Sequence, residues 1–517
     1  MEATRIWEWL EAEKIEAGCK DLGAGGLGGA SSELVLAGGF GADIDLDRVP
    51  RSDEPLLLQI LCGGNQERFV WAIPEEHAGT FLSIFNERYE LGRVYPGARA
   101  AVIGTVIAES VYRARWEGAV VCELSAAILE ESPIAPRPIA PRTQAAPVRD
   151  PGSPGIGPTG CAGSSGGWNA AARAPIYRSY DQEVQGHALF RPGEADAGVC
   201  RPISGAALGI AVSVDGNPEY GSLDPYWGGV LSVLESARNV AAVGAEPLAI
   251  TDCLNFGNPE DAVCLGDLDA ALRGWPTPAA LSGSPGHPDE PLPIVSGNVS
   301  LYNQSSRGRA IPPSPIVACF GILPDYGRAV PQRLCQTGDT LLLVGARARH
   351  WGRPERAAGG RVPDRPLADQ VTEIRTVQSL AADGSLAACH DVSDGGILRT
   401  LFEMAVFEDG PGEFGIDCDL SDLGDLPPHE LLLSETPGFV VEVAPERITE
   451  VRRTLDAAGC ESFLLGRVTE GTRWRVRNGD ETLFEVALRE LHPVWARPLV
   501  HWLLDPASRR AETGRNR

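Results

Sequence analysis

Lysine is almost absent from this sequence: among 517 residues it occurs only as Lys14 and Lys20. A lysine that grips phosphate groups therefore cannot lie anywhere beyond residue 20. Paired cysteines are absent too. The twelve cysteines are scattered singly, with no Cys-x-x-Cys pair and no histidine at zinc-site spacing. We interpret them as reduced, mostly buried thiols, as in a cytosolic protein.

Long apolar runs and an excess of positive charge are also lacking. No run approaches the roughly 20 apolar residues that a membrane-spanning helix needs. The first residues, MEATRIWEWL, lack the apolar stretch and cleavage site of a signal peptide, which predicts a cytoplasmic protein. The formal net charge of −25 argues against nonspecific binding to nucleic acid or to an anionic membrane, so neither is expected as a partner.

Composition divides the chain into segments. Its length suits about three domains, and 43% hydrophobic with 22% charged residues is typical of globular protein with real cores. Residues 130–174 are rich in Pro, Ala, Gly and Ser and almost without periodicity, which predicts an extended or disordered linker. The expected domains are 1–129, 175–330 and 331–505, followed by a polar tail at 506–517.

Strand-like and helix-like patterns alternate along the chain and predict an α/β (α+β) fold. Helices are expected at 76–89 and 228–243, and strands at 56–61, 68–73, 100–107, 207–212, 315–323 and 339–344.

The first and third segments look like repeats of one another. Residues 20–27 (KDLGAGGL) align with residues 390–397 (HDVSDGGI), and the strand-like residues 58–73 align with 431–443. Gly64 follows Asp21 at almost the same distance as Glu435 follows Asp391. Matched spacing to a second landmark makes coincidence a poor explanation.

Two runs near the middle of the chain point to phosphate chemistry. Residues 251–260 (TDCLNFGNPE) and 296–303 (SGNVSLYN) place small residues and oxygen-bearing side chains directly after the apolar, strand-like residues 247–250 and 291–295. Glycine lets a backbone approach a polyphosphate closely. Carboxylate and carboxamide oxygens are the ligands that Mg²⁺ prefers.

These runs resemble signature segments of the synthetase subunit of phosphoribosylformylglycinamidine synthase, the amidotransferase of de novo purine synthesis. The resemblance covers nearly the whole chain and implies aminoimidazole ribonucleotide synthetase-like N-domains and C-domains in a pseudo-twofold arrangement, with the first N-domain absent. Further matching runs are 180–186 (YDQEVQG), 215–218 (DGNP), 223–226 (LDPY), 237–239 (ARN) and 390–397.

The resemblance also implies an activity. Such enzymes use ATP and Mg²⁺ to phosphorylate the amide oxygen of formylglycinamide ribonucleotide. Ammonia then displaces phosphate from the iminophosphate to give formylglycinamidine ribonucleotide. Ammonia would come from a glutaminase subunit, and a small bridging subunit would complete the complex. This chain would be a carbon–nitrogen ligase that needs the missing N-domain for activity.

The resemblance assigns roles to eight positions. Two would contact ATP, two would bind Mg²⁺ and four would contact the ribonucleotide: respectively Asp252 and Gly297; Asp21 and Asn298; Gly64, Asn65, Gln66 and Ser300. Ordinary roles remain open, as turn or capping residues or, for Ser300, as a strand hydroxyl. No catalytic base is assigned, because the family's catalytic histidine belongs to the absent domain. His390 is expected to make local hydrogen bonds.

Departures from the family pattern keep other functions open. Gly64 and Asn65 replace an acidic residue and a serine of the family's substrate loop, whereas Glu435 of the repeat keeps the acidic residue. The alternative is therefore a non-catalytic nucleotide-binding or scaffold subunit of the same complex. An aminoimidazole ribonucleotide synthetase or selenophosphate synthetase is disfavoured by the DCLNFGNP run and the extra upstream domain.

Overall fold

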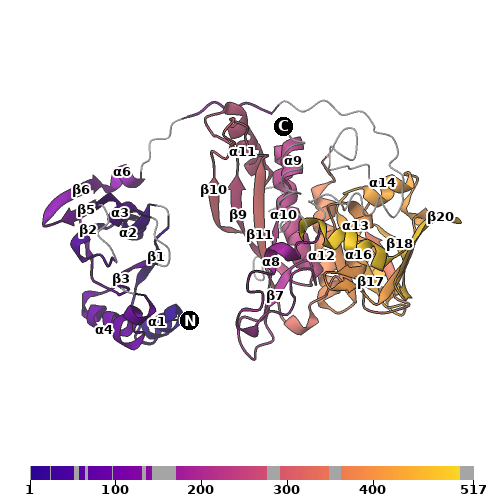
Figure 1. Cartoon of the computed structure of the whole chain (residues 1–517), viewed down its shortest axis with the longest axis horizontal. Helices are drawn as coiled ribbons and strands as arrows, with labels where there is room; N and C mark the ends of the chain where they lie inside the picture. Colours follow the sequence, from indigo (N-terminus) through magenta and orange to yellow (C-terminus); the bar gives the residue numbers. More distant parts are fainter. Residues whose placement is uncertain are drawn as a thin grey trace. The chain divides into compact units, whose positions relative to one another are not determined.

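The computed structural model describes residues 2–23, 25–51, 57–63, 68–95, 97–130, 136–142, 171–275, 291–347 and 362–500. The chain forms two compact units, Met1–Pro136 (unit 1) and Arg137–Arg517 (unit 2), and Figure 1 labels their elements. Within the described ranges, no helix has both the length and the apolar character needed to cross a membrane.

Unit 1 is built from short strands and helices. In chain order they are α1 (Glu2–Ala12), β1 (Gly18–Asp21), α2 (Gly26–Leu36), β2 (Gly41–Asp45), η1 (Leu46–Arg48), α3 (Leu57–Cys62), β3 (Phe69–Ala72), η2 (Glu75–His77), α4 (Ala78–Ser83), η3 (Ile84–Arg88), α5 (Leu91–Val94), β4 (Gly104–Ile107), β5 (Val111–Trp116), β6 (Ala119–Ser125) and α6 (Ala126–Glu130). β1 pairs with β3, and a second sheet has the order β4-β2-β5-β6. The main core of unit 1 lies between these strands and helices α2 and α3.

Unit 2 contains two larger sheets. Its elements are α8 (Ala174–Tyr177), η5 (Val184–Gly186), β7 (Gly198–Cys200), β8 (Gly209–Asp215), α9 (Pro218–Leu223), α10 (Pro225–Ala242), β9 (Glu246–Asn255), α11 (Ala262–Gly274), β10 (Ile294–Ser300), β11 (Ser314–Leu323), η7 (Tyr326–Arg328), β12 (Thr340–Val344), α12 (Leu367–Ala382), β13 (Ala388–Val392), α13 (Gly396–Ala405), β14 (Val406–Phe407), β15 (Gly410–Pro411), β16 (Phe414–Asp419), η8 (Ser421–Leu423), α14 (Pro428–Leu433), β17 (Gly438–Val443), α15 (Ile448–Ala458), β18 (Ser462–Glu470), β19 (Arg473–Asn478), β20 (Glu481–Ala487) and α16 (Leu488–Ala496). The sheets have the orders β10-β9-β11-β8-β7 and β13-β17-β12-β18-β16-β19-β20.

Helix α10 lies between the two sheets of unit 2 (Figure 1). It packs against β8, β9 and β11 on one side and against α12 and β13 on the other. Fourteen of its eighteen residues are buried, so this helix has no solvent-facing polar stripe. Polar residues on α10 therefore face the protein interior, where each needs a partner.

The predicted repeats fold alike. β1 pairs with β3 so that Asp21 faces Phe69, and β13 pairs with β17 so that Asp391 faces Phe439. In unit 2, β12 lies between β17 and β18 and joins the pair β13-β17 to β18, β16, β19 and β20 in one seven-stranded sheet. The described part of unit 1 contains no counterpart of β12, so its two sheets stay separate.

A carboxylate held by two arginines recurs in both repeats. In each, the acid lies on one strand and both arginines lie on its parallel partner strand. The groups are Asp43 with Arg113 and Arg115 in unit 1, and Asp417 with Arg475 and Arg477 in unit 2.

One predicted strand is wrong. Residues 56–61 were expected to be a strand, but α3 covers Leu57–Cys62. Ile60 is buried and Leu61 packs beside it, whereas Leu58 is 72% exposed. This is the pattern of a helix face, which a short apolar run does not distinguish from a strand. The aligned run at 431–443 also begins in a helix, since α14 ends at Leu433.

The remaining predicted elements overlap observed ones. Residues 76–89 coincide with η2, α4 and η3, and residues 228–243 coincide with α10. The other predicted strands coincide with β3, β4, β8, β11 and β12. Of the predicted linker, residues 136–142 have no regular secondary structure, and residues 131–135 and 143–170 lie outside the described residues.

The strands also run further than the sequence predicted. β9 and β10 continue through the two motifs instead of ending before them. β10 is an edge strand that is exposed at six of its seven positions, so it needs no apolar alternation. Its parallel pairing with β9 supplies the backbone hydrogen bonds that define the strand.

The glycine-rich turn of the second repeat gives a test of the fold. Gly396 has φ +65°, and a Cβ there would lie 2.6 Å from the carbonyl oxygen of Ser434. Gly459 has φ +78° but nothing within 4 Å of such a Cβ. We expect Gly396→Ala to lower the free energy of unfolding by about 3 kcal/mol, and Gly459→Ala by about 1 kcal/mol, in chemical denaturation. Equal losses would contradict the close approach at Gly396.

Candidate functional site

The parallel pairing of β9 with β10 brings two predicted ATP contacts together. Gly297 lies opposite Asp252 in the strand register. A Cβ at position 297 would overlap the Asp252 carboxylate, so only glycine fits beside this side chain. Burial raises the pKa of Asp252. These two residues are therefore neighbours, and their role as ATP contacts stays a prediction.

The other two predicted residues of β10 face the opposite side of the sheet. Side chains alternate along a strand, so Asn298 and Ser300 share one face and Asp252 lies on the other. Asn298 is exposed, and its carboxamide has no hydrogen-bond partner among the described residues. A ligand that used all of these groups would have to wrap around the free edge of β10, with Gly297 offering only backbone.

The end of β10 is tied to the end of β9. The Asn303 side chain donates to the carbonyl oxygens of Phe256 and Ser300, at 3.2 and 2.7 Å. Tyr302 donates its backbone N–H to Gly257 at 3.1 Å and has φ +62°. A non-glycine residue in this left-handed region is uncommon and costs conformational energy. The two motif loops therefore form one rigid corner.

The remaining predicted residues are elsewhere. Asp21 is exposed at the end of β1 in unit 1, whereas Asn298 is in unit 2, so the expected pairing of these two at one Mg²⁺ stays a prediction. Gly64, Asn65 and Gln66 lie outside the described residues.

Sequence reasoning assigned no role to an acidic cluster at the interior face of α10. We define it as Asp215 at the end of β8 with Glu235 and Asn239 one turn apart on α10. Asn239 donates to Asp215 Oδ1 at 3.0 Å, but Asp215 Oδ2 and Asn239 Oδ1 are buried with no partner among the described residues. Beside the cluster, Arg238 donates two bonds of 3.1 Å to one oxygen of Asp391.

The charge of this region is unbalanced. The charge of Arg238 acts on three carboxylates, those of Asp215, Glu235 and Asp391. Its hydrogen bonds go to Asp391. Burial and the Asp391 charge raise the pKa of Asp215 to about 7, and burial with the Asp215 charge raises the pKa of Glu235 well above its usual range. Orphaned oxygens with excess negative charge are the ligand type that Mg²⁺ takes.

A signal for this cluster exists in the sequence. The runs 215–218 and 237–239 were recognised as family-like, and Glu235 precedes Asn239 by four residues, the spacing of one helix face. What the sequence does not reveal is that α10 is buried on both sides, which turns polar residues of a helix into an interior cluster.

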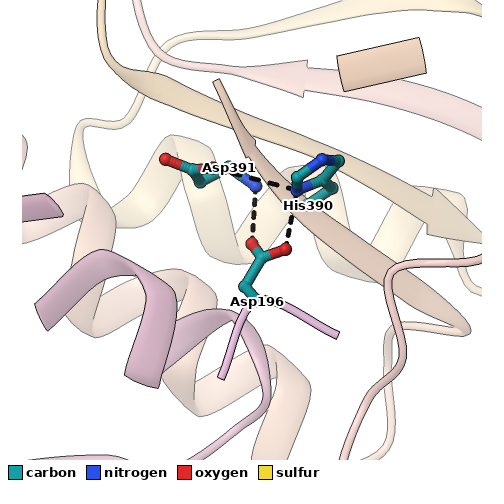
Figure 2. Close-up of side chains that lie close together, drawn as sticks. All are labelled: Asp196, His390 and Asp391. Atoms are coloured by element: carbon teal, nitrogen blue, oxygen red, sulfur yellow. Dashed lines mark hydrogen bonds and ion pairs between the residues drawn. The ribbon is translucent and has the colours of Figure 1, made fainter. Parts of the chain in front are cut away.

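His390 makes local contacts, as predicted. Its Nδ1 lies 2.6 Å from Asp196 Oδ1 as an ion pair, and its Nε2 lies 3.4 Å from Glu403 Oε2. Figure 2 shows the Asp196 carboxylate reaching both this imidazole and the backbone nitrogen of Asp391, at 2.8 Å. Arg399 donates in turn to Glu403.

This histidine network fits an ion pair better than a metal site. Asp196, His390 and Asp391 bring one ligand atom each within 4.8 Å of one another. However, Asp391 is already paired with Arg238. Two ligands around zinc lie about 3.3 Å apart, so the 2.6 Å contact between Asp196 and His390 is too short to hold an ion between them.

Comparison with known proteins identifies both kinds of domain. The model of the AIR synthase related protein C-terminal domain matches residues 7–117 and 336–477, and that of the N-terminal domain matches residues 194–323. The subunit PurL of phosphoribosylformylglycinamidine synthase from Deinococcus radiodurans is 32% identical over 524 residues, covering 96% of this chain and 67% of that protein. The chain belongs to the PurL family.

Other PurL proteins agree with this assignment. PurL of Methanothrix thermoacetophila is 40% identical over 501 residues, which cover 95% of this chain and 64% of the relative, so the chain spans about two thirds of a PurL protein. The structure of Thermotoga maritima PurL complexed with AMPPCP is 25% identical with a TM-score of 0.62, over 89% of this chain and 66% of that one. The predicted family and AIR synthetase-like fold are confirmed.

The histidine network predicts a pH-dependent contribution to stability. Burial alone would lower the pKa of His390, but Asp196 and Glu403 raise it well above 6.5. The stabilisation is therefore complete below pH about 6.5 and is lost as the pH rises through the folded-state value. We expect His390→Gln to cost about 3–5 kcal/mol at pH 6 and less in alkaline solution, measured by chemical denaturation.

The matched control for this test is His492→Gln, because the His492 ring pairs with the Glu408 carbonyl oxygen at 3.1 Å rather than with a carboxylate. Its cost should not fall as the pH rises. A pH-independent cost of His390→Gln would show that the imidazolium contributes nothing.

The acidic cluster predicts stabilisation by Mg²⁺. An ion bound only to the folded state adds about 2.7 kcal/mol at a hundredfold excess over its Kd. We expect the melting temperature to be higher in Mg²⁺ than in EDTA, and this shift to grow between pH 6 and 8 as Asp215, with a pKa of about 7, loses its proton.

Asp215→Asn should shrink that shift. Asp417→Asn is the control, since Asp417 is already held by Arg475 and Arg477. An undiminished shift in Asp215→Asn would mean that Mg²⁺ stabilises the protein from some other place.

Proposed function

We propose that this chain is the ATP-dependent synthetase subunit that converts formylglycinamide ribonucleotide to formylglycinamidine ribonucleotide. It would work as a carbon–nitrogen ligase in the cytoplasm. The observation that carries the proposal is the Asp252–Gly297 pair on adjacent strands, in a chain of the PurL family. The glycine leaves room for the Asp252 carboxylate against the β10 backbone, where the carboxylate can accept hydrogen bonds from a nucleotide.

Nucleotide binding is the first part of the proposal. The complex of T. maritima PurL with AMPPCP supports an ATP site formed by Asp252 and Gly297. Because the described chain has no lysine beyond residue 20, Mg²⁺ would supply much of the charge that neutralises the phosphates. The resemblance makes Asn298 and Asp21 ligands of Mg²⁺, and the acidic cluster would hold a further ion.

The ribonucleotide contacts and partners complete the proposal. Ser300 would contact the substrate from the face that it shares with Asn298, and the resemblance assigns Gly64, Asn65 and Gln66 to the same substrate. Ammonia would come from a glutaminase subunit, joined by a small bridging subunit. Neither nucleic acid nor a membrane is proposed as a partner.

A non-catalytic nucleotide-binding subunit is the second candidate. The observation in its favour is the contrast between the repeats. In unit 2 the Glu435 carboxylate accepts hydrogen bonds from Gly395 N–H and the Tyr220 hydroxyl. The aligned residue of unit 1 is Gly64, which has no carboxylate to offer a substrate.

The test measures binding and turnover separately. Calorimetry of the full chain with Mg-AMPPCP should give binding, and Asp252→Asn should weaken it about 10- to 100-fold, as expected for the loss of a hydrogen bond by a charged group. The control is Glu246→Gln, at the other end of β9, whose pKa is also raised by burial and whose loss should leave binding unchanged. Equal affinities for wild type and Asp252→Asn would refute the assigned site.

Turnover is then measured as formylglycinamidine ribonucleotide formed from substrate, Mg-ATP and ammonium chloride, with the chain alone and with the glutaminase and bridging subunits. Product that depends on Asp252 supports the enzyme. Nucleotide binding without product under every combination supports the non-catalytic subunit.

A further inference from the structure

A short segment of the predicted linker is docked on the rest of unit 2. We call residues 137–142 the strap. Its Ala140 N–H donates to the Ala262 carbonyl oxygen at 2.9 Å, in the first turn of α11. The Arg142 guanidinium holds the Asp267 carboxylate with two parallel bonds, one of them 3.0 Å from Nε to Oδ1. The strap is thus fixed to α11 by both backbone and side chain.

Helix α11 is shaped to receive the strap. The Asp267 side chain is 2% exposed, and a carboxylate removed from water needs a cation that is brought to it. One residue earlier, a Cβ at Gly266 would overlap the carbonyl oxygen of Ala140. A glycine next to a buried acid is hard to explain on an otherwise ordinary helix, but it is what a crossing backbone with an arginine requires.

The strap also reaches the corner formed by the two motif loops. The Arg137 guanidinium lies 3.7 Å from Glu260 Oε1, and the Tyr302 hydroxyl donates to the same oxygen at 3.4 Å. Glu260 ends the motif that begins in β9, and Tyr302 follows Ser300 in the second motif. The strap therefore contacts α11 at Arg142 and the loop from β9 to α11 at Arg137, and that loop also contacts Tyr302 just beyond β10.

We propose that Arg142 is a positioning residue for nucleotide binding: its ion pair with Asp267 holds the strap on α11, and the strap fixes the loop from β9 to α11 beside the end of β10. This inference rests on the proposed function, because it takes the β9–β10 corner as the nucleotide site. The strap is the first segment of unit 2 in the chain, so nucleotide affinity would depend on how this segment is held on α11.

The main experiment compares nucleotide affinity in full-length variants. Calorimetry with Mg-AMPPCP at 25 °C should show about tenfold weaker binding in Arg142→Ala and in Gly266→Ala, in line with coupling between distant groups. The first variant removes the ion pair from the strap, and the second places a Cβ on α11 where the strap backbone crosses it. Arg142→Lys should recover part of the affinity, because it keeps the charge but not the paired bonds.

The control is Arg273→Ala. Arg273 pairs with Asp269 on the exposed side of the same helix, so it tests whether any lost ion pair on α11 weakens binding. Thermal denaturation of each variant separates the two roles. If Arg142→Ala melts earlier but binds Mg-AMPPCP like the wild type, the strap is only structural and the proposal is overturned.

Proteolysis tests docking without any nucleotide. In the wild type, the ion pair should slow tryptic cleavage after Arg142, whereas Asp267→Asn and Gly266→Ala should be cleaved several-fold faster. Equal cleavage rates overturn the docking and the inference with it. A wild type that shows the expected protection but binds no Mg-AMPPCP overturns the proposed nucleotide site, and with it the positioning role, while the docked strap stands.

Discussion

The ion pair between Arg238 and Asp391 is the contact on which the interior of unit 2 depends. It joins α10 to β13 across the boundary between the two sheets, and both side chains are 4% exposed. Such a pair gains little over an apolar contact of the same shape, but removing one partner leaves a buried charge. The pair therefore fixes which face of α10 meets β13.

That pair also determines the character of the acidic cluster. Arg238 directs its two bonds at Asp391, and Asp215 Oδ2 and Asn239 Oδ1 remain without partners among the described residues. A hydrophobic boundary would have been simpler and as stable. We interpret these two oxygens as metal ligands. A bound metal ion would supply both the positive charge and the coordination that they lack in the protein.

Much of the fold follows from the sequence, because it is carried by local patterns. The alternation in β11 and the length of α10 are readable from spacing alone, and so is the repeat, since its glycine-rich turns require φ values that other residues avoid, such as +83° at both Gly25 and Gly395. The helix at Leu57–Cys62 was missed because a short apolar run carries no period. These residues form a helix because their apolar side chains pack against α2.

The sequence predicts only part of the candidate site, because some of its geometry depends on contacts between distant elements. Asp252 and Gly297 are neighbours through parallel pairing, which two motifs at successive strands predict. The opposite orientation of Asn298 depends on how far β10 extends, and an exposed edge strand has no hydrophobic pattern to show that. Nor can any local rule show that Glu235 and Asn239 face inward, because this follows from a second sheet more than a hundred residues away.

The two repeats differ at the position of Glu435, which aligns with Gly64. In unit 2, Glu435 is committed to the glycine-rich turn and to Tyr220, with its side chain 3% exposed. A carboxylate used in this way secures the contact between the two sheets and is closed to a substrate. Unit 1 has Gly64 at the aligned position, which offers no carboxylate for that structural role. Loss of the acid at this position removes a structural contact as well as a charge, so it fits a substrate-binding role of Gln66 as well as it fits a non-catalytic subunit.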